Sequence, residues 1–352
     1  MLAITVRPGV ANSAALTEMP EPDPAQGAVL VKALALGVCG TDREILAAEY
    51  GAAPPGEERL ILGHESLGEV LEAPRGSGFA PGDIVVGIVR RPDPVPCPAC
   101  AAGEWDMCRN GRYTERGIKE RHGYGAERYR IEPEFTVKVD RALGLCGVLL
   151  EPASVLAKAW DHIVRIGHRG RVFAPRTLLV TGAGPIGLIA ALFGRQRGLE
   201  VTVYDRNTDG PKPDLVRALG GTYLSGELEA LDTLAPDIVI ECTGAVPVIT
   251  AVLGRTAPAG IVCLTGVSAT GRTSPLDVGH INRAMVLDNG VAFGTVNANR
   301  THFEMAAAAL AQADKTWLGR LISRRVPLAR WQDALAHQPD DIKTVVEFGM
   351  AA

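Results

Sequence analysis

The chain of 352 residues contains no run of basic residues and no long uninterrupted apolar stretch. Lys and Arg total 36 and Asp and Glu total 40, which gives a formal net charge of −4 at neutral pH. A balance of this kind does not favour nucleic acid or an anionic membrane surface as a partner. We therefore expect neither, and we expect a small, weakly charged molecule instead.

Signals for export or membrane insertion are also missing. The first ten residues, MLAITVRPGV, lack the charged and apolar regions of a secretory signal. The most apolar window, residues 178–194, contains Gly and Pro and is shorter than the roughly 20 residues that cross a bilayer. We expect a cytoplasmic protein. The seven cysteines are odd in number, and a reducing compartment does not favour a disulfide framework, so some thiols are candidates for metal binding.

The composition, with 47% hydrophobic and 22% charged residues, is typical of a folded protein, and the length favours two domains. In the first third, short β-prone runs such as 28–36, 82–89 and 126–131 are separated by Gly and Pro, which predicts a small barrel or sandwich. From about residue 151 strands alternate with apolar helices, which predicts βαβ units and a parallel sheet. An Ala-rich helix follows residue 297. The elements from there to the C-terminus could pack on either domain.

The segment TGAGPIGL, residues 181–188, follows an apolar strand and opens a helix. Gly182 would allow a tight turn, Gly184 would let the backbone approach a pyrophosphate, and Gly187 would let helix and strand pack closely. Pro185 and Ile186 complete the turn. A Gly-rich turn alone is weak evidence, but strand, turn and helix in this register predict a dinucleotide site.

The next predicted strand ends at Asp205, which is placed to accept hydrogen bonds from the ribose hydroxyls and to repel a 2′-phosphate, so it favours NAD. Arg206 follows directly and can pair with such a phosphate, so NADP remains open. Further on, residues 237–244 predict another strand, with Thr243 at its C-terminal edge, where ligands bind in open parallel sheets.

Cys39, His64, Glu65 and Glu151 carry side chains that bind zinc, and three protein ligands with an open position make a catalytic site. The spacing of these residues does not show that they meet. Taken singly, a buried thiol, a core histidine and a solvated carboxylate are the more frequent roles.

Five motifs resemble the medium-chain, zinc-dependent alcohol dehydrogenase superfamily and occur in its order: GVCGTD (37–42), GHESLGEV (63–70), PGD (81–83), GYGAERY (123–129) and TGAGPIGL (181–188). The resemblance implies an α/β protein with a GroES-like β-barrel catalytic domain, residues 1–153 completed by 297–352, and a doubly wound Rossmann domain, residues 154–296. It also implies Cys39, His64 and Glu151 as ligands of the catalytic zinc, with Glu65 as an exchanging or neighbouring ligand.

Within this superfamily the stretches CGTDREI, VRRPD, LLEPASVLAKAWDHI and GTVNANRTHFEMAAAALAQAD are similar to the glucose 1-dehydrogenases. By that resemblance Thr41 passes the substrate proton outward, Glu115 contacts a sugar hydroxyl, and Glu151 lies beside the substrate. Asn297 is implied to touch the sugar or the nicotinamide. The alternative for Glu115 and Asn297 is a surface charge and a turn residue.

The sequence departs from the family at a second metal lobe. Relatives with a structural zinc show four cysteines spaced C-x₂-C-x₂-C-x₇-C, but only Cys97, Cys100 and Cys108 fit here, and Pro94 takes the first position. Asp93 is a candidate oxygen ligand. Two interpretations stay open, a zinc bound by three thiolates and Asp93, and a lobe without metal.

A second departure concerns the substrate. Val155 stands where the family often has an acid that faces the sugar, so one polar contact is absent. The three other cysteines lie in apolar contexts and are expected to be buried thiols: Cys146, Cys242 and Cys263.

Together these observations predict an enzyme that transfers a hydride from C1 of a glucose-like aldose to NAD or NADP, with catalytic Zn²⁺, and gives a lactone. One alternative is a polyol, amino-sugar or cyclitol dehydrogenase of the same fold. The other is a non-catalytic nucleotide-binding relative, which does not account for a complete ligand set. The resemblance also implies a homodimer or homotetramer.

Overall fold

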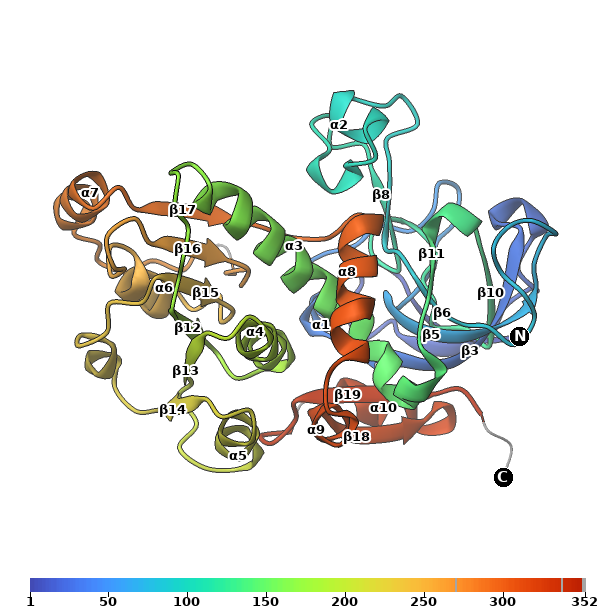
Figure 1. Ribbon diagram of the computed structural model, residues 1–352. Helices are drawn as coiled ribbons and strands as arrows, with labels where there is room; N and C mark the ends of the chain where they lie inside the picture. Colours follow the sequence, from blue (N-terminus) through green and yellow to red (C-terminus); the bar gives the residue numbers. More distant parts are fainter. Residues whose placement is uncertain (270, 337, 350–352) are drawn as a thin grey trace. The chain divides into compact units, whose positions relative to one another are not determined.

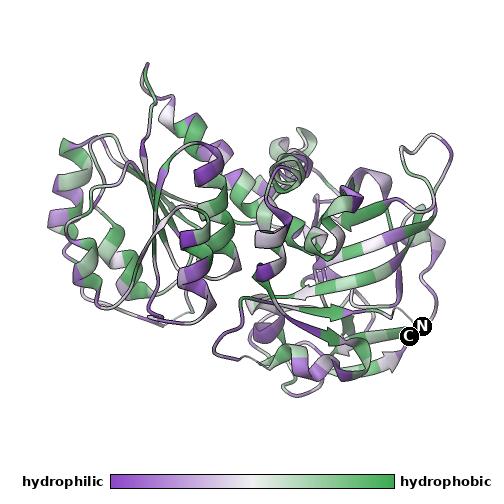
Figure 2. Ribbon diagram, turned by 60° about the horizontal axis from the view of Figure 1, so that its bottom comes forward, coloured by the Kyte–Doolittle hydropathy of each residue, from purple (hydrophilic) through white to green (hydrophobic). Residues whose placement is uncertain are grey.

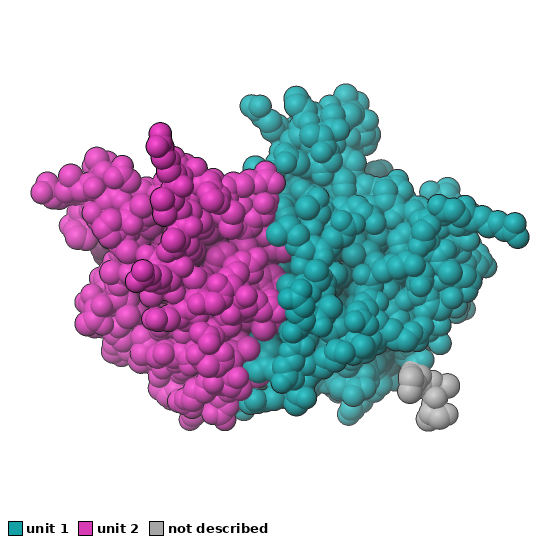
Figure 3. Space-filling model, in the orientation of Figure 1, with its two compact units in different colours: residues 1–154, 297–352 teal, residues 155–296 magenta. Residues whose placement is uncertain are grey.

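The computed structural model describes residues 1–269, 271–336 and 338–349. The chain forms two compact units. The first, unit 1, contains residues 1–154 and 297–352, and the second, unit 2, contains residues 155–296 (Figure 3). Helix α3 (Leu150–Gly167) runs from the one into the other.

Unit 2 is built on a six-stranded parallel sheet with the spatial order β14-β13-β12-β15-β16-β17. Numbered within the unit, this is the order 3-2-1-4-5-6 of a dinucleotide-binding sheet, so the predicted Rossmann domain topology is confirmed. The strands are β12 (Thr177–Thr181), β13 (Glu200–Tyr204), β14 (Thr222–Leu224), β15 (Ile238–Glu241), β16 (Ile261–Leu264) and β17 (Val291–Gly294).

The central strands of this sheet are buried on both sides rather than in alternation, with apolar residues at their centres, because helices pack on both faces of a parallel sheet (Figure 2). Residues 238–241 of β15 are all buried. Helix α4 contacts both β12 and β13. The elements between the strands are α4 (Pro185–Gln196), α5 (Pro211–Ala218), η5 (Leu228–Leu231), α6 (Val246–Val252) and α7 (Val278–Leu287).

Unit 1 is β-rich and mainly antiparallel, as expected for its first part. In its seven-stranded sheet, β3 pairs with β5, β10 and β19, and only β18 and β19 are parallel. The C-terminal strand β19 therefore lies beside β3, with Val345 opposite Gly37. The strands are β3 (Val29–Val38), β5 (Glu65–Glu72), β6 (Ile84–Gly87), β10 (Arg128–Ile131), β11 (Thr136–Lys138), β18 (Ile322–Pro327) and β19 (Lys343–Glu347).

Two small sheets complete unit 1. One joins β1 (Leu2–Val6), β2 (Ala15–Glu18) and β4 (Leu60–Ile61), and the other joins β7 (Arg90–Arg91), β8 (Thr114–Arg116) and β9 (Glu120–Arg121). Between β7 and β8 the chain forms a lobe around α2 that projects from the unit (Figure 1). The helices are α1 (Gly40–Leu46), α2 (Pro98–Ala101), α8 (Arg300–Ala311), α9 (Lys315–Leu321) and α10 (Trp331–Leu335), with short 3₁₀ turns η1 (Pro24–Gln26), η2 (Trp105–Met107), η3 (Pro133–Phe135), η4 (Arg141–Leu149) and η6 (Leu328–Arg330).

One helical stretch of the described chain, residues 141–167, is long and apolar enough to cross a membrane. Its most apolar window of 18 residues is 72% buried within the fold, as is common for a core helix of a soluble protein. The apolar window 178–194 that stands out in the sequence is divided between β12 and α4. The cytoplasmic location stays a prediction.

Glu132 holds the small sheet β7-β8-β9 in place. Arg91 of β7 donates to its Oε2 from Nη2 at 2.9 Å, and Arg121 of β9 donates to its Oε1 at 2.8 Å. Arg116 of β8 lies 3.9 Å away. Burial alone would raise the pKa of Glu132, but Arg91 and Arg116 outweigh it and lower that pKa to about 2.

We expect Glu132→Gln to lower the free energy of unfolding at pH 7 by about 2–3 kcal/mol, because three arginines lose their shared anion. The pKa of Glu132 is about 2 in the folded chain against an ordinary 4.5, so its stabilisation is complete above pH 4.5 and is lost as the pH falls toward 2. Urea denaturation at pH 7 and pH 3 measures this. The difference from wild type should shrink by more than half at pH 3, whereas the exposed neighbour control Glu134→Gln should change little at either pH.

Candidate active site

Cys39, His64 and Glu65 form one group in unit 1, with their ligand atoms within 4.8 Å of one another. The Sγ of Cys39 lies 3.0 Å from Nε2 of His64. On the other side of the ring, Nδ1 of His64 lies 3.6 Å from Oδ1 of Asp42. His64, Glu65 and Asp42 are all buried. The arrangement is a thiol, an imidazole and a carboxylate that converge, with a second carboxylate orienting the imidazole.

Strand pairing brings this group together. Cys39 follows β3 and caps α1, while Glu65 begins β5, and the register of the two strands places Gly37 opposite Glu65. A Cβ at Gly37 would lie 2.1 Å from Oε2 of Glu65, so only glycine leaves room for the carboxylate. Gly63 has a φ of +92°, which turns the chain into His64.

Lys343 of β19 compensates the charge of Glu65. Its Nζ donates to both carboxylate oxygens, at 2.7 and 2.6 Å, and also to the carbonyl of Val38 at 3.3 Å. Both side chains are almost completely buried. Although burial lowers the pKa of Lys343 by itself, Glu65 and Cys39 raise it above the ordinary value, so the pair is ionic.

Glu151, at the start of α3, is buried and lies outside the tight group of Cys39, His64 and Glu65. Burial and the nearby Glu65 raise its pKa to about 7, against the opposing effect of His64. Its carboxylate makes no hydrogen bond with any residue that the structure describes.

Burial also acts to lower the pKa of His64, but the charges of Cys39 and Asp42 raise it well above the ordinary value.

The donor set fits zinc. A thiolate and an imidazole are typical zinc ligands. Nδ1 of His64 and Oδ1 of Asp42 are both buried without a hydrogen bond and lie 3.6 Å apart, so they can pair once the ring is oriented. Glu65 is bound to Lys343, and Glu151 is not bound, so Glu151 is the carboxylate that is available to a cation.

The three other residues expected at the substrate are also in unit 1. Thr41 is half-buried at the second position of α1, two residues after Cys39. Glu115 is buried in β8, and Nδ2 of Asn297 donates to its Oε1 at 2.9 Å. Asn297 has a φ of +61°, a conformation that asparagine tolerates. The structure therefore brings Glu115 and Asn297 together although 182 residues separate them.

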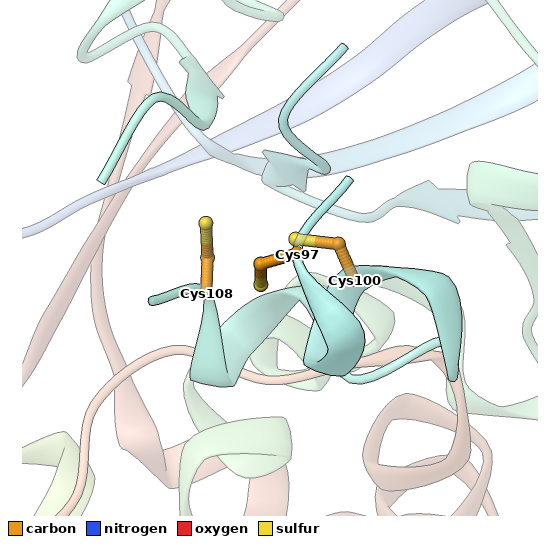
Figure 4. Close-up of side chains that lie close together, drawn as sticks. All are labelled: Cys97, Cys100 and Cys108. Carbon is orange, nitrogen blue, oxygen red and sulfur yellow. The ribbon is translucent and has the colours of Figure 1, made fainter. Parts of the chain in front are cut away.

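The sulfurs of Cys97, Cys100 and Cys108 gather beside α2, within 4.8 Å of one another (Figure 4). Hydrogen bonds from the backbone N–H groups of Arg109 and Cys100 lower the pKa of Cys97 to about 6, which favours the thiolate. Burial raises the pKa of Cys100 to about 11. The cluster has the thiols, but not the fourth position, of a closed zinc site.

Asp93 does not supply that fourth position in this conformation. Its Oδ1 accepts from the N–H of Val95 at 2.8 Å, and its Oδ2 accepts from Asn110 at 2.8 Å and from Arg112 at 3.2 Å. The carboxylate lies outside the group of three sulfurs. In the structure this carboxylate stabilises the loop that leads into the lobe, and its role as a fourth zinc ligand stays a prediction.

The Gly-rich turn in unit 2 has the conformation that the sequence predicts. Gly182 has a φ of +92°, and a Cβ at Gly187 would lie 1.7 Å from the carbonyl oxygen of Gly182. A Cβ at Gly184, by contrast, would meet no atom within 4 Å, so the turn is open there. Gly184 caps α4 and Pro185 and Ile186 begin it, which leaves free backbone N–H groups at a helix N-terminus for an anion.

Asp205 is buried, and its carboxylate already has partners. Its Oδ2 accepts from the N–H of Ala183 at 2.6 Å, and Lys212 of α5 lies 3.3 Å away. Arg206 is exposed beside it. The carboxylate thus links the end of β13 to the Gly-rich turn, and a cation stands next to it.

Thr243 lies after β15, at the point where the strand order of the sheet reverses. Glu241, completely buried, organises this turn. It accepts from the N–H of Thr243 at 2.7 Å, from the N–H of Gly244 at 3.2 Å, and from the hydroxyls of Thr181 and Thr243. Gly182 and Thr243 are in contact range, because a Cβ at Gly182 would lie 2.9 Å from Cγ2 of Thr243.

The sequence interpretation missed the residues that support the site. Asp42 and Lys212 had a local signal, an acid three residues after Cys39 and a lysine in the helix after Asp205. Lys343 and Arg90 had none, because their partners Glu65 and Glu115 are distant in the sequence. The full set of supporting residues is Asp42, Arg90, Lys212, Glu241 and Lys343.

Comparisons with known proteins agree with this architecture. The family model for the alcohol dehydrogenase GroES-like domain matches residues 25–141, and the model for the glucose dehydrogenase C-terminus matches residues 144–348. The expected fold class, a GroES-like β-domain with a Rossmann domain, is confirmed.

Among curated proteins, the chain is 40% identical to a glucose 1-dehydrogenase of Methanocella arvoryzae over 99% of this chain and 100% of that one. It is 42% identical to a glucose 1-dehydrogenase of Thermoproteus tenax over 99% of both chains.

Among solved structures, a glucose dehydrogenase of Haloferax mediterranei in complex with NADP, zinc and gluconolactone matches with a TM-score of 0.92 and 31% identity over all of both chains. An alcohol dehydrogenase of Thermotoga maritima, 22% identical, shares the fold with a TM-score of 0.83 over 98% of both chains. The motif resemblance and these matches agree, and the chain belongs to the glucose dehydrogenase family of the zinc-dependent alcohol dehydrogenases.

Proposed function

We propose that this protein is a zinc-dependent dehydrogenase that oxidises C1 of a glucose-like aldose with NAD or NADP and gives a lactone. The observation that carries the proposal is the convergence of Cys39, His64 and Glu65, with Glu151 nearby, in a chain of the glucose dehydrogenase family. We propose that unit 1 binds the metal and the sugar, and that unit 2 binds the nucleotide.

Cys39, His64 and Glu151 would hold the zinc, and Glu65 would stay on Lys343 or exchange onto the metal. Zinc supplies a Lewis acid, which lowers the pKa of a bound hydroxyl and so allows its proton to leave near neutral pH. Oδ1 of Asp42, 3.6 Å from Nδ1 of His64, would accept from that nitrogen and so hold the ring in one orientation and tautomer. Lys343 donates to both carboxylate oxygens of Glu65 within the interior.

Thr41 would carry the proton of the sugar hydroxyl outward, since its hydroxyl is half-buried near Cys39 and is both donor and acceptor. The nicotinamide nucleotide supplies the hydride acceptor. Gly184 and the N-terminus of α4 would hold its pyrophosphate, and Thr243 would line its crevice. Glu115 and Asn297 would orient the sugar.

Purified protein loaded with zinc should reduce NAD or NADP when D-glucose is added, measured by absorbance of the reduced nicotinamide. His64→Ala should lower kcat/KM by more than about 100-fold and should lower the zinc content by one per chain, because a first ligand is lost. His168→Ala, an exposed histidine, is the matched control and should retain both.

Turnover of a polyol, amino sugar or cyclitol with none of glucose would keep the zinc mechanism but assign a different substrate, and Val155 would be the first residue to examine. No turnover of any of these by zinc-loaded, folded protein would overturn the enzymatic proposal. A second zinc that survives in His64→Ala but is lost in Cys100→Ser would belong to the cysteine lobe.

For the choice of cofactor, we propose that Lys212 is the residue that lets NADP bind. A lone carboxylate at Asp205 would repel a 2′-phosphate, but the Nζ of Lys212 lies 3.3 Å from Asp205 and offsets its charge. Arg206 is exposed beside it and supplies a second cation. Both nucleotides should therefore be accepted.

Lys212→Met should lower the ratio of kcat/KM for NADP to that for NAD by about fivefold to tenfold, because one cation near the phosphate is removed. The dissociation constants of both nucleotides, measured by calorimetry, should show the same preference: NADP should bind more weakly relative to NAD than in the wild type. Lys315→Met, an exposed lysine of unit 1, should leave the ratio unchanged. An unchanged ratio in Lys212→Met would contradict this role.

We propose further that the chain self-associates through α7 and the edge strand β17. None of the ten residues of α7 is buried, and its apolar side chains Val278, Val286 and Leu287 are 63%, 65% and 63% exposed. Strand β17 ends the sheet, so its outer backbone groups have no strand partner within the described chain. Such an apolar face beside an open sheet edge favours pairing of two copies.

Val286→Glu should shift the protein toward the monomer in light scattering coupled to size exclusion, since two buried carboxylates would meet across a twofold interface. Val10→Glu, which introduces the same charge at a valine 51% exposed in unit 1, should leave the mass unchanged. A wild-type protein that is monomeric at micromolar concentration would contradict the proposal.

A further inference from the structure

Glu115 is held by one of its two oxygens. Oε1 accepts from Nε of Arg90 at 3.0 Å and from Nδ2 of Asn297 at 2.9 Å, and Nη2 of Arg90 lies 3.0 Å from it in the same ion pair. Oε2 makes no hydrogen bond with the residues that the structure describes. Two donors and the ion pair on one oxygen hold the carboxylate and leave the other oxygen with its full capacity to accept.

Arg90 is itself fixed from three sides. Its guanidinium lies 3.7 Å from the ring centre of Tyr113, and its Nη1 donates to the carbonyl of Asp106 at 3.1 Å. Its side chain is 8% exposed and that of Glu115 is 6% exposed. A buried, stacked guanidinium with its donors occupied has little freedom, so the position of Glu115 is fixed as well.

The carbonyl that anchors Arg90 belongs to the cysteine lobe, because Asp106 lies in η2, two residues before Cys108. The same residue contacts the other side of the site. Oδ1 of Asp106 accepts from Nδ2 of Asn299 at 3.0 Å, and Asn299 caps α8 two residues after Asn297. The lobe thus supports both Glu115 and Asn297, one through Arg90 and the other through the cap of α8.

We propose that Arg90 is a positioning residue for sugar recognition, which binds one oxygen of Glu115 so that the other accepts a sugar hydroxyl, and that the cysteine lobe is the support on which it rests. This inference rests on the proposed function. It assigns to the lobe a role in substrate binding that does not depend on whether it holds a metal. Arg90 is distinct from the catalytic residues, since it acts only through Glu115.

Arg90→Lys should raise KM for D-glucose about tenfold and change kcat less than about threefold. The lysine ammonium keeps the charge, but it cannot contact Glu115, Tyr113 and Asp106 at the same time. KM for the nucleotide should not change. The upward shift of the unfolding temperature on addition of glucose to the zinc-loaded enzyme should shrink as well, which measures binding apart from turnover.

Arg91→Lys is the matched control. Arg91 is the next residue of β7, is also buried, and donates to Glu132 through Nε and Nη2, an arginine–carboxylate pair like that of Arg90 with Glu115. It should lose a similar amount of thermal stability while KM for glucose changes less than about twofold. Equal changes of KM in both variants would show a structural effect of the sheet and would overturn the proposal.

The double variant Arg90→Lys with Glu115→Gln decides whether Arg90 acts through Glu115. If it does, the KM of the double variant lies within about twofold of the KM of Glu115→Gln alone. Multiplicative effects of the two substitutions would contradict the proposal. Absence of glucose turnover in the wild type is a failure of the proposed function, whereas wild-type turnover with an unchanged KM in Arg90→Lys is a failure of this inference alone.

Discussion

Burial of charge is the constraint on which unit 1 depends. A carboxylate inside a protein is stable only when cations or hydrogen-bond donors replace the water that it loses. Glu65 begins β5 opposite Gly37 of β3, where its carboxylate leaves no space for a Cβ. Lys343 neutralises it from β19. The ion pair therefore joins the first sheet strands to the C-terminal strand, and it does so beside Cys39 and His64.

The same constraint applies to other fully or partly buried carboxylates, each of which has its own set of partners. Glu132 shares three arginines, Glu115 has Arg90, and Glu241 in unit 2 has only N–H and hydroxyl donors. Glu151 is the exception. It is buried without a hydrogen bond to the described chain, and its pKa is raised to about 7. A divalent cation beside it would reverse that shift, which is the state expected of a metal ligand.

The contacts of the cysteine lobe concern more than metal binding. Its three sulfurs are adjacent, yet Asp93 has other partners and does not complete a closed metal site. The lobe nevertheless holds Arg90 and Asn299 through Asp106. These contacts support Glu115 and Asn297, the proposed sugar contacts, whether or not the lobe holds a metal.

The sequence alone determined the Rossmann sheet, the turn 181–188 and the alternation of the early strands, because these depend on local periodicity and on glycine at positions that the backbone requires. Motif resemblance added Cys39, His64 and Glu151. Only the tertiary structure decided that Lys343 neutralises Glu65, that Arg90 holds Glu115, and that the Asp93 carboxylate bonds to Val95, Asn110 and Arg112. Those contacts join residues that are far apart in the sequence or depend on how a loop folds, and no local pattern records which buried charge will meet which partner.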